Sequence, residues 1–128
     1  MYQQKFQIVT NNPMVLDEFG KSYDVNFLGD YSIKQVMMEV RDMCINGHEL
    51  LTHPLSGSVK PGETPYKSVL ISKETGKPDY SGAELADAAT QACEKFASMH
   101  KDWSPSVLDD FQLVDYTLIS SGIESAVR

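Results

Sequence analysis

The segment from Thr52 to Ser68 holds the densest group of side chains that could do chemistry. It combines hydroxyl groups, one imidazole, two lysines and flexible glycines in a chain whose formal net charge is -7. Lysine ammonium groups, together with backbone N–H groups near glycines, bind phosphate and carboxylate oxygens in proteins. The segment therefore predicts a site for a small anion. A solvated loop stiffened by its prolines explains the same composition, and the sequence leaves both interpretations open.

His53 is the candidate for acid–base chemistry, because an unperturbed imidazole titrates at about pH 6.5. A structural histidine that hydrogen-bonds the loop backbone is the alternative. Gly57 and Gly62 have the spacing of a phosphate-binding P-loop, but Glu63 stands where that motif requires a lysine, so we exclude a P-loop. No recognised spacing of metal ligands occurs, and we expect neither a metal nor a cofactor.

A second polar group, Thr10 to Asn12, directly follows an apolar segment. The two asparagine amides could reach the same crevice as the loop, although Asn12 could instead cap the helix that Pro13 opens. The complete set of predicted ligand-binding residues is Thr10, Asn11, Asn12, Thr52, His53, Ser56, Ser58, Lys60 and Lys67.

Short apolar segments between breaker residues predict the strands that position these groups. They cover residues 5–10, 24–28, 49–52 and 68–72, each rich in β-branched, leucine or aromatic residues. The long polar segment joins the third strand to the fourth without a helix between them. Those two strands therefore form a wide antiparallel hairpin or pair with other strands, and the sequence does not choose.

Apolar residues at helical spacing predict four helices. The first follows Asn12, and the next two follow Ser32 and Ser81, each of which has a glutamine or glutamate three residues later in the spacing of a capping box. A fourth begins at Ser104-Pro105. We favour a helix there although residues 114–119 are also rich in strand formers.

This order of elements predicts one α/β domain over residues 1–128. The expected architecture has three layers, with a mostly parallel sheet of about four strands and helices on both faces. Open α/β sheets bind ligands at the carboxyl ends of their strands. The predicted anion site would lie at that edge.

Composition narrows the classes of partner. The chain has 11 basic and 18 acidic side chains, and this balance repels nucleic acid. No apolar segment has the length of a signal peptide or a membrane span, so we expect a cytoplasmic protein with no membrane partner. Cys44 and Cys93 lie in apolar helical patterns and are predicted to be buried free thiols. The oligomeric state stays open, because an uncovered sheet edge can pair.

Four segments resemble the GrdX family over nearly the whole chain: Thr-Asn-Asn-Pro at 10–13, Thr-His-Pro-Leu-Ser-Gly-Ser-Val-Lys-Pro at 52–61, Glu-Thr-Pro-Tyr-Lys-Ser at 63–68 and Asp-Phe-Gln-Leu-Val-Asp at 110–115. The resemblance implies a small protein encoded alongside the selenoprotein glycine reductase system of amino-acid-fermenting anaerobic bacteria. It assigns no catalytic residue. An anaerobic cytoplasm agrees with two unpaired cysteines.

Three hypotheses follow. The first is an accessory or regulatory protein of reductive amino-acid metabolism that binds a small anion, such as phosphate, acetyl phosphate or a carboxylate. The second is an enzyme that uses His53 as acid or base. The third is a module that docks on a glycine reductase component through the helix after Ser104.

Overall fold

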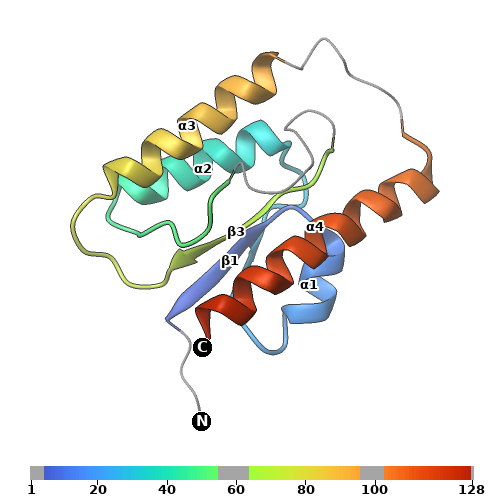
Figure 1. Ribbon diagram of the computed structural model, residues 1–128, viewed down its shortest axis with the longest axis horizontal. Helices are drawn as coiled ribbons and strands as arrows, with labels where there is room; N and C mark the ends of the chain where they lie inside the picture. The colour runs from blue at the N-terminus through green and yellow to red at the C-terminus, as the bar shows by residue number, and fades with distance from the viewer. Residues whose placement is uncertain (1–4, 55–63, 96–102, 128) are drawn as a thin grey trace.

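The computed structural model describes residues 5–54, 64–95 and 103–127. Within them the chain forms three strands and four helices, which Figure 1 shows in order. The elements are β1 (Phe6–Thr10), α1 (Pro13–Phe19), β2 (Val25–Phe27), α2 (Ile33–Ile45), β3 (Ser68–Ser72), α3 (Tyr80–Lys95) and α4 (Pro105–Ala126).

The sheet has the strand order β2-β1-β3, with β1 in the middle. β1 runs parallel to β2, with Ile8 opposite Val25, and antiparallel to β3, with Thr10 opposite Ser68. The expected three-layer fold on a mostly parallel sheet of about four strands is therefore wrong. The described sheet has three strands, and one of its two strand pairs is antiparallel. After α2 the chain passes beside β3 at residues 49–52 and has reversed its direction when it enters β3.

Residues 49–52 do not form the predicted strand. They lie antiparallel beside β3 through a single bridge between Leu50 and Ile71, supported by a hydrogen bond from the Leu51 N–H to the Leu70 carbonyl at 2.9 Å. The ladder then stops, because the next donor, the Leu70 N–H, bonds the side-chain hydroxyl of Thr52 at 3.0 Å. The open question about this pair is thus answered: the two segments run antiparallel.

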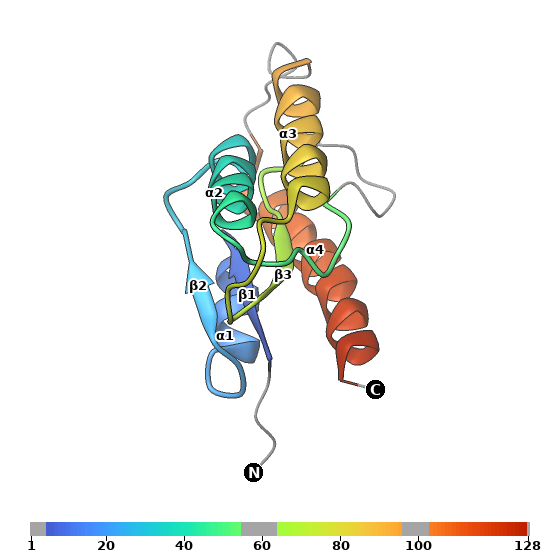
Figure 2. The ribbon, with the colours of Figure 1, turned by 90° about the vertical axis from the view of Figure 1, so that its left-hand side faces the viewer.

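Alternate side chains of the sheet enter two separate cores, as the period of two in a strand requires. Val9, Val69 and Ile71 pack with buried residues of α2 and α3. Ile8 and Leu70 pack against α1 and α4 on the other face. Figure 2 shows α2 beside α3, with α1 and α4 across the sheet from them.

Three helices begin where the sequence predicts. The Asn12 side chain accepts the Met14 N–H ahead of α1, and Ser32 forms both halves of a capping box ahead of α2. Ser104 caps α4, with Pro105 in its first turn. The interpretation of residues 105–126 as a helix, despite their strand formers, is confirmed.

The residue predicted to cap the start of α3, Ser81, is not its cap. No Ser81 capping box forms; instead the Asp79 carboxylate accepts the Gly82 N–H at 2.9 Å, and α3 begins at Tyr80. The second carboxylate oxygen accepts the Leu50 N–H at 2.9 Å. Asp79 therefore caps the helix and also anchors the segment beside β3, a tertiary bond that local spacing does not contain.

Both cysteines are buried free thiols, as predicted. Cys44 lies in the last turn of α2, which ends at Ile45 and has Asn46 as its C-cap. Gly47 follows with a φ of 106°, a conformation that favours glycine.

Candidate functional site

A buried chain of hydrogen bonds runs from the end of β1 to the middle of α4. The Asn12 N–H donates to Thr10 Oγ1 at 2.9 Å, Thr10 Oγ1 lies 2.6 Å from Ser68 Oγ, and Ser68 Oγ donates to Asp115 Oδ2 at 2.6 Å. A hydroxyl has one hydrogen to donate. Because Asp115 takes the hydrogen of Ser68, Thr10 is the donor between the two hydroxyls. All three hydrogen bonds therefore run in the same direction, from Asn12 through Thr10 and Ser68 to Asp115. Hydrogen bonds in such a buried chain polarise and strengthen one another.

Asn12 is both a helix cap and a cross-link. Its Oδ1 accepts the Met14 N–H at 3.0 Å, while its Nδ2 donates to the Gln112 carbonyl at 2.9 Å and to Asp115 Oδ2 at 3.0 Å. Both amide hydrogens are used inside the protein. The arrangement supports the alternative in which Asn12 is structural.

Asn11 holds the segment that carries the candidate lysine. Its Nδ2 donates to the Tyr31 and Pro65 carbonyls, each at 2.9 Å, and its Oδ1 accepts the Lys67 N–H at 2.9 Å. The side chain is 3% exposed. Asn11 therefore positions Lys67 through the backbone and offers no free amide hydrogen to a ligand.

Asp115 receives donors on both carboxylate oxygens. Oδ1 accepts the Ser68 N–H at 3.0 Å, and Oδ2 accepts Ser68 Oγ and Asn12 Nδ2. Burial raises the pKa of Asp115, while the hydrogen bonds from Ser68 and Asn12 and the charge of Lys67 act in the opposite direction. The carboxyl is thus a buried acid held by donors alone.

Our sequence reasoning missed Asp115 as a site residue. Its signal was present: Asp115, Ile119 and Ile123 recur every four residues, and all three are buried on one side of α4. An acid in the apolar stripe of a helix needs partners inside the protein. The helical spacing marks the buried acid, whereas its partners, Asn12 at the N-cap of α1 and Ser68 of β3, are visible only in the fold.

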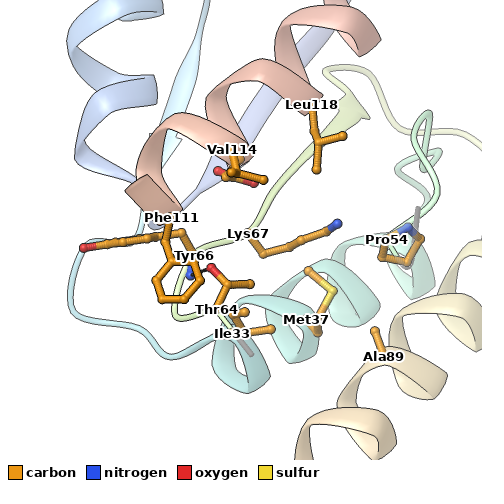
Figure 3. Close-up of a pocket in the computed structure, with 11 residues that line it drawn as sticks. Ile33, Met37, Pro54, Thr64, Tyr66, Lys67, Ala89, Phe111, Val114 and Leu118 are labelled. Atoms are coloured by element: carbon orange, nitrogen blue, oxygen red, sulfur yellow. Dashed lines mark hydrogen bonds between the residues drawn. The ribbon is translucent and has the colours of Figure 1, made fainter. Parts of the chain in front are cut away.

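Lys67 directly precedes β3 and sends its side chain between α2 and α4 (Figure 3). Within the described residues its ammonium makes no hydrogen bond or ion pair. Burial lowers the pKa of Lys67, and the charges of Asp115 and Cys93 oppose that shift. The amine is therefore a partly buried cation without a direct counter-ion in this part of the chain.

The pocket around Lys67 is small and mostly apolar. Its inner volume is about 20 Å³, and it is partly open to solvent. α2, α3 and α4 all contribute to its wall, as Figure 3 shows. The lining residues are Ile33, Met37, Pro54, Thr64, Tyr66, Lys67, Ala89, Phe111, Val114, Asp115 and Leu118.

The described loop residues Thr52 and His53 do not line this pocket. Thr52 uses its hydroxyl on the Leu70 N–H, and the exposed His53 does not line the Lys67 pocket. Pro54, which is fully buried, lines it instead. Ser56, Ser58 and Lys60 lie outside the described residues. The structure thus brings together Thr10, Asn11, Asn12 and Lys67 from the predicted set, with Asp115 added.

A second, open hollow of about 590 Å³ lies beside the start of α2. Asn11, Tyr31 and Trp103 contribute to its wall, along with the acids Asp30 and Glu94. Lys34 in this hollow already pairs with Glu94 at 2.8 Å. Because this hollow contains two acids, and its cation Lys34 is already paired, it is less suited to an anion than the Lys67 pocket.

Among residues 5–54, 64–95 and 103–127, no three His, Cys, Asp or Glu side chains gather as a metal site would require. Over the same ranges, none of the helices has the combined length and apolarity needed to cross a membrane.

The fold and site together define a small α/β domain with a three-stranded mixed sheet, a buried Asp–Ser–Thr network and a mostly apolar pocket that holds Lys67. A family model described as GrdX-like protein matches residues 7–124, and the chain belongs to this family. The resemblance seen in the sequence is confirmed over nearly the whole chain. No curated protein and no solved structure matches the chain.

Proposed function

We propose that this GrdX-like protein is an accessory protein of reductive amino-acid metabolism, associated with glycine reductase, that binds a small organic anion in the Lys67 pocket. One observation carries the binding proposal: the Lys67 ammonium enters an apolar pocket and finds no direct partner among the described residues. A buried charge without a partner is costly. A bound anion would supply the missing partner and offset that cost.

The pocket favours a small monoanion. Its inner volume of about 20 Å³ and its mostly apolar wall disfavour a hydrated or highly charged group. Acetate carries one charge and a methyl group that suits Met37, Val114 and Leu118. Phosphate and acetyl phosphate carry more charge and more atoms, so they should bind more weakly than acetate.

Calorimetry with acetate, phosphate and acetyl phosphate, at constant ionic strength, tests the binding proposal. A ligand at 100 times its dissociation constant stabilises the folded state by about 2.7 kcal/mol, which a thermal melt detects. We expect acetate to release or absorb heat and to raise the melting temperature. If none of the three anions does either, the proposal is wrong.

A pair of lysine variants locates the binding. Lys67→Met keeps the length of the side chain and removes its charge, whereas Lys77→Met makes the same change at an exposed lysine outside this pocket. We expect acetate binding to disappear in the first variant and to persist in the second. Equal binding by both would show that Lys67 is not the anion partner.

The link to glycine reductase rests on the family, and the exposed surface of α4 suggests how it could operate. Leu113 is 52% exposed, and Val114 and Leu118 are each 40% exposed on the same helix. Exposed apolar groups of this kind mark protein interfaces. A docking module for a reductase component is therefore the second candidate function.

Co-purification from an anaerobic host that expresses glycine reductase tests docking. We expect Leu113→Gln to lose the reductase components and Val127→Gln, a similarly exposed apolar residue at the helix end, to retain them. Retention by both variants would argue against docking through this part of α4. The acid–base alternative is not favoured, since His53 does not line the Lys67 pocket.

A further inference from the structure

Lys67 differs from Lys34 and Lys73 in its surroundings. Those two lysines form surface ion pairs with Glu94 and Asp24 at 2.8 and 2.9 Å, and a neighbouring carboxylate favours the charged form of an amine. Lys67 forms no ion pair with a described residue and lies between Met37 and Leu118 (Figure 3). The Asp115 carboxylate lines the same pocket and opposes the lowering of the Lys67 pKa, but burial has the larger effect. An apolar wall favours the neutral form of an amine, and only the neutral form has a lone pair that attacks carbon.

We propose that Lys67 is a nucleophile that captures a small aldehyde or ketone as an imine inside this pocket. The inference uses the same pocket as the proposed function but a different state of the side chain: the ammonium binds an anion, and the neutral amine reacts with a carbonyl. Either proposal stands without the other.

The step balances without an added reagent. The Lys67 nitrogen attacks the carbonyl carbon, a C–N bond forms, and the C=O π electrons move to oxygen to give a carbinolamine. The C–O bond then breaks, and the oxygen leaves as water with the two hydrogens of the amine. An imine remains on Lys67, and nothing is oxidised or reduced.

Three features of the pocket support this chemistry. The amine is not engaged by another described residue, so its lone pair is not tied up once the proton is lost. The lowered pKa of Lys67 makes the neutral form more abundant near neutral pH than it is for a surface lysine. The small inner volume of the pocket favours a carbonyl compound of a few heavy atoms.

Reductive trapping on the full native chain tests the proposal. The protein is treated at about pH 7 with limiting acetaldehyde and cyanoborohydride, which converts an imine to a stable ethylamine, and the lysines are ranked by peptide mass spectrometry. We expect Lys67 to be ethylated faster than exposed Lys77, because a lowered pKa raises the fraction of the amine that is neutral at this pH. Equal or slower ethylation of Lys67 would overturn the proposal.

Benzaldehyde provides a size control. We expect it to label Lys77 faster than Lys67, because its ring is much bulkier than the methyl group of acetaldehyde and the pocket is small. Labelling of both lysines at the same rate would show that the pocket does not enclose the reaction and would also overturn the proposal. If calorimetry detects acetate binding but trapping shows no preference for Lys67, the imine proposal is wrong and the anion-binding proposal stands. Preferential trapping without any anion binding supports the imine and refutes the anion site.

Discussion

The hydroxyl of Ser68 donates to Asp115 at 2.6 Å, although the two residues are 47 positions apart in the chain. A bond of this length is typical of a hydroxyl on an ionised carboxylate. The Ser68 N–H donates to the other oxygen of Asp115 at 3.0 Å. One carboxylate thus holds both donors of the first residue of β3 and fixes α4 against the sheet next to Lys67.

Removing the charge of Asp115 should destabilise the fold. All three groups around the carboxylate are donors, so the amide of Asp115→Asn would direct its own N–H groups at a donor. We expect a loss of about 1–3 kcal/mol in the free energy of unfolding, measured with urea. Asp110→Asn, an exposed change on the same helix, is the control and should be near neutral. Equal stability of the two variants would contradict this role.

The stability of the protein should depend on pH through Lys67. Its pKa is lowered in the folded state, so between that lowered value and about pH 10.4 the unfolded chain binds more protons than the folded chain. The free energy of unfolding contributed by this group therefore rises with pH across that window. Lys67→Met lacks the effect.

We expect Lys67→Met to be more stable than the native chain by roughly 1–3 kcal/mol near neutral pH, because a partly buried charge is removed. This gap should narrow as pH rises towards about 10. Urea titrations of both proteins at several pH values measure this difference in the free energy of unfolding. Groups that titrate in both proteins contribute equally and drop out of the difference. A gap that stays constant with pH would show that Lys67 keeps an ordinary pKa.

Gly82→Ala should destabilise the chain although alanine favours helices. A methyl group there would meet the Asp79 carboxylate, and Cys44 Sγ would be only 3.0 Å away. Overpacking of this kind costs about 1–3 kcal/mol, against a propensity gain of about 1 kcal/mol. We expect a lower urea midpoint. Gly76→Ala, which meets no atom within 4 Å, should leave the midpoint unchanged or higher.

Thr52→Val should weaken the edge of the sheet. The Leu70 N–H would lose its acceptor at 3.0 Å, and the segment beside it bridges β3 only at Leu50 and Ile71. An unsatisfied buried donor costs about 1–3 kcal/mol, measurable by chemical unfolding. Thr117→Val removes an exposed hydroxyl that bonds within α4 and is the control. If both variants lose the same stability, the Thr52 hydroxyl does not support the sheet.

Hydrogen-bond caps and apolar periodicity are local, and they determined most of the elements from the sequence. Asn12 with Pro13, Ser32 with Gln35, and Ser104 with Pro105 each begin a helix where the pattern predicts one. The family was also visible in the sequence, because its motifs are contiguous.

Tertiary structure alone decided the direction of the third strand in the sheet and the partners of Asp115. A strand's residue pattern reports which faces are buried but not which neighbour it pairs with, so Ser68–Ser72 fits a parallel or an antiparallel place equally well. The antiparallel pairing of β1 with β3 places Ser68 opposite Thr10, so Lys67 lies next to the end of β1. The polar network and the lysine pocket follow from that pairing, because their members come from segments that only the folded chain brings together.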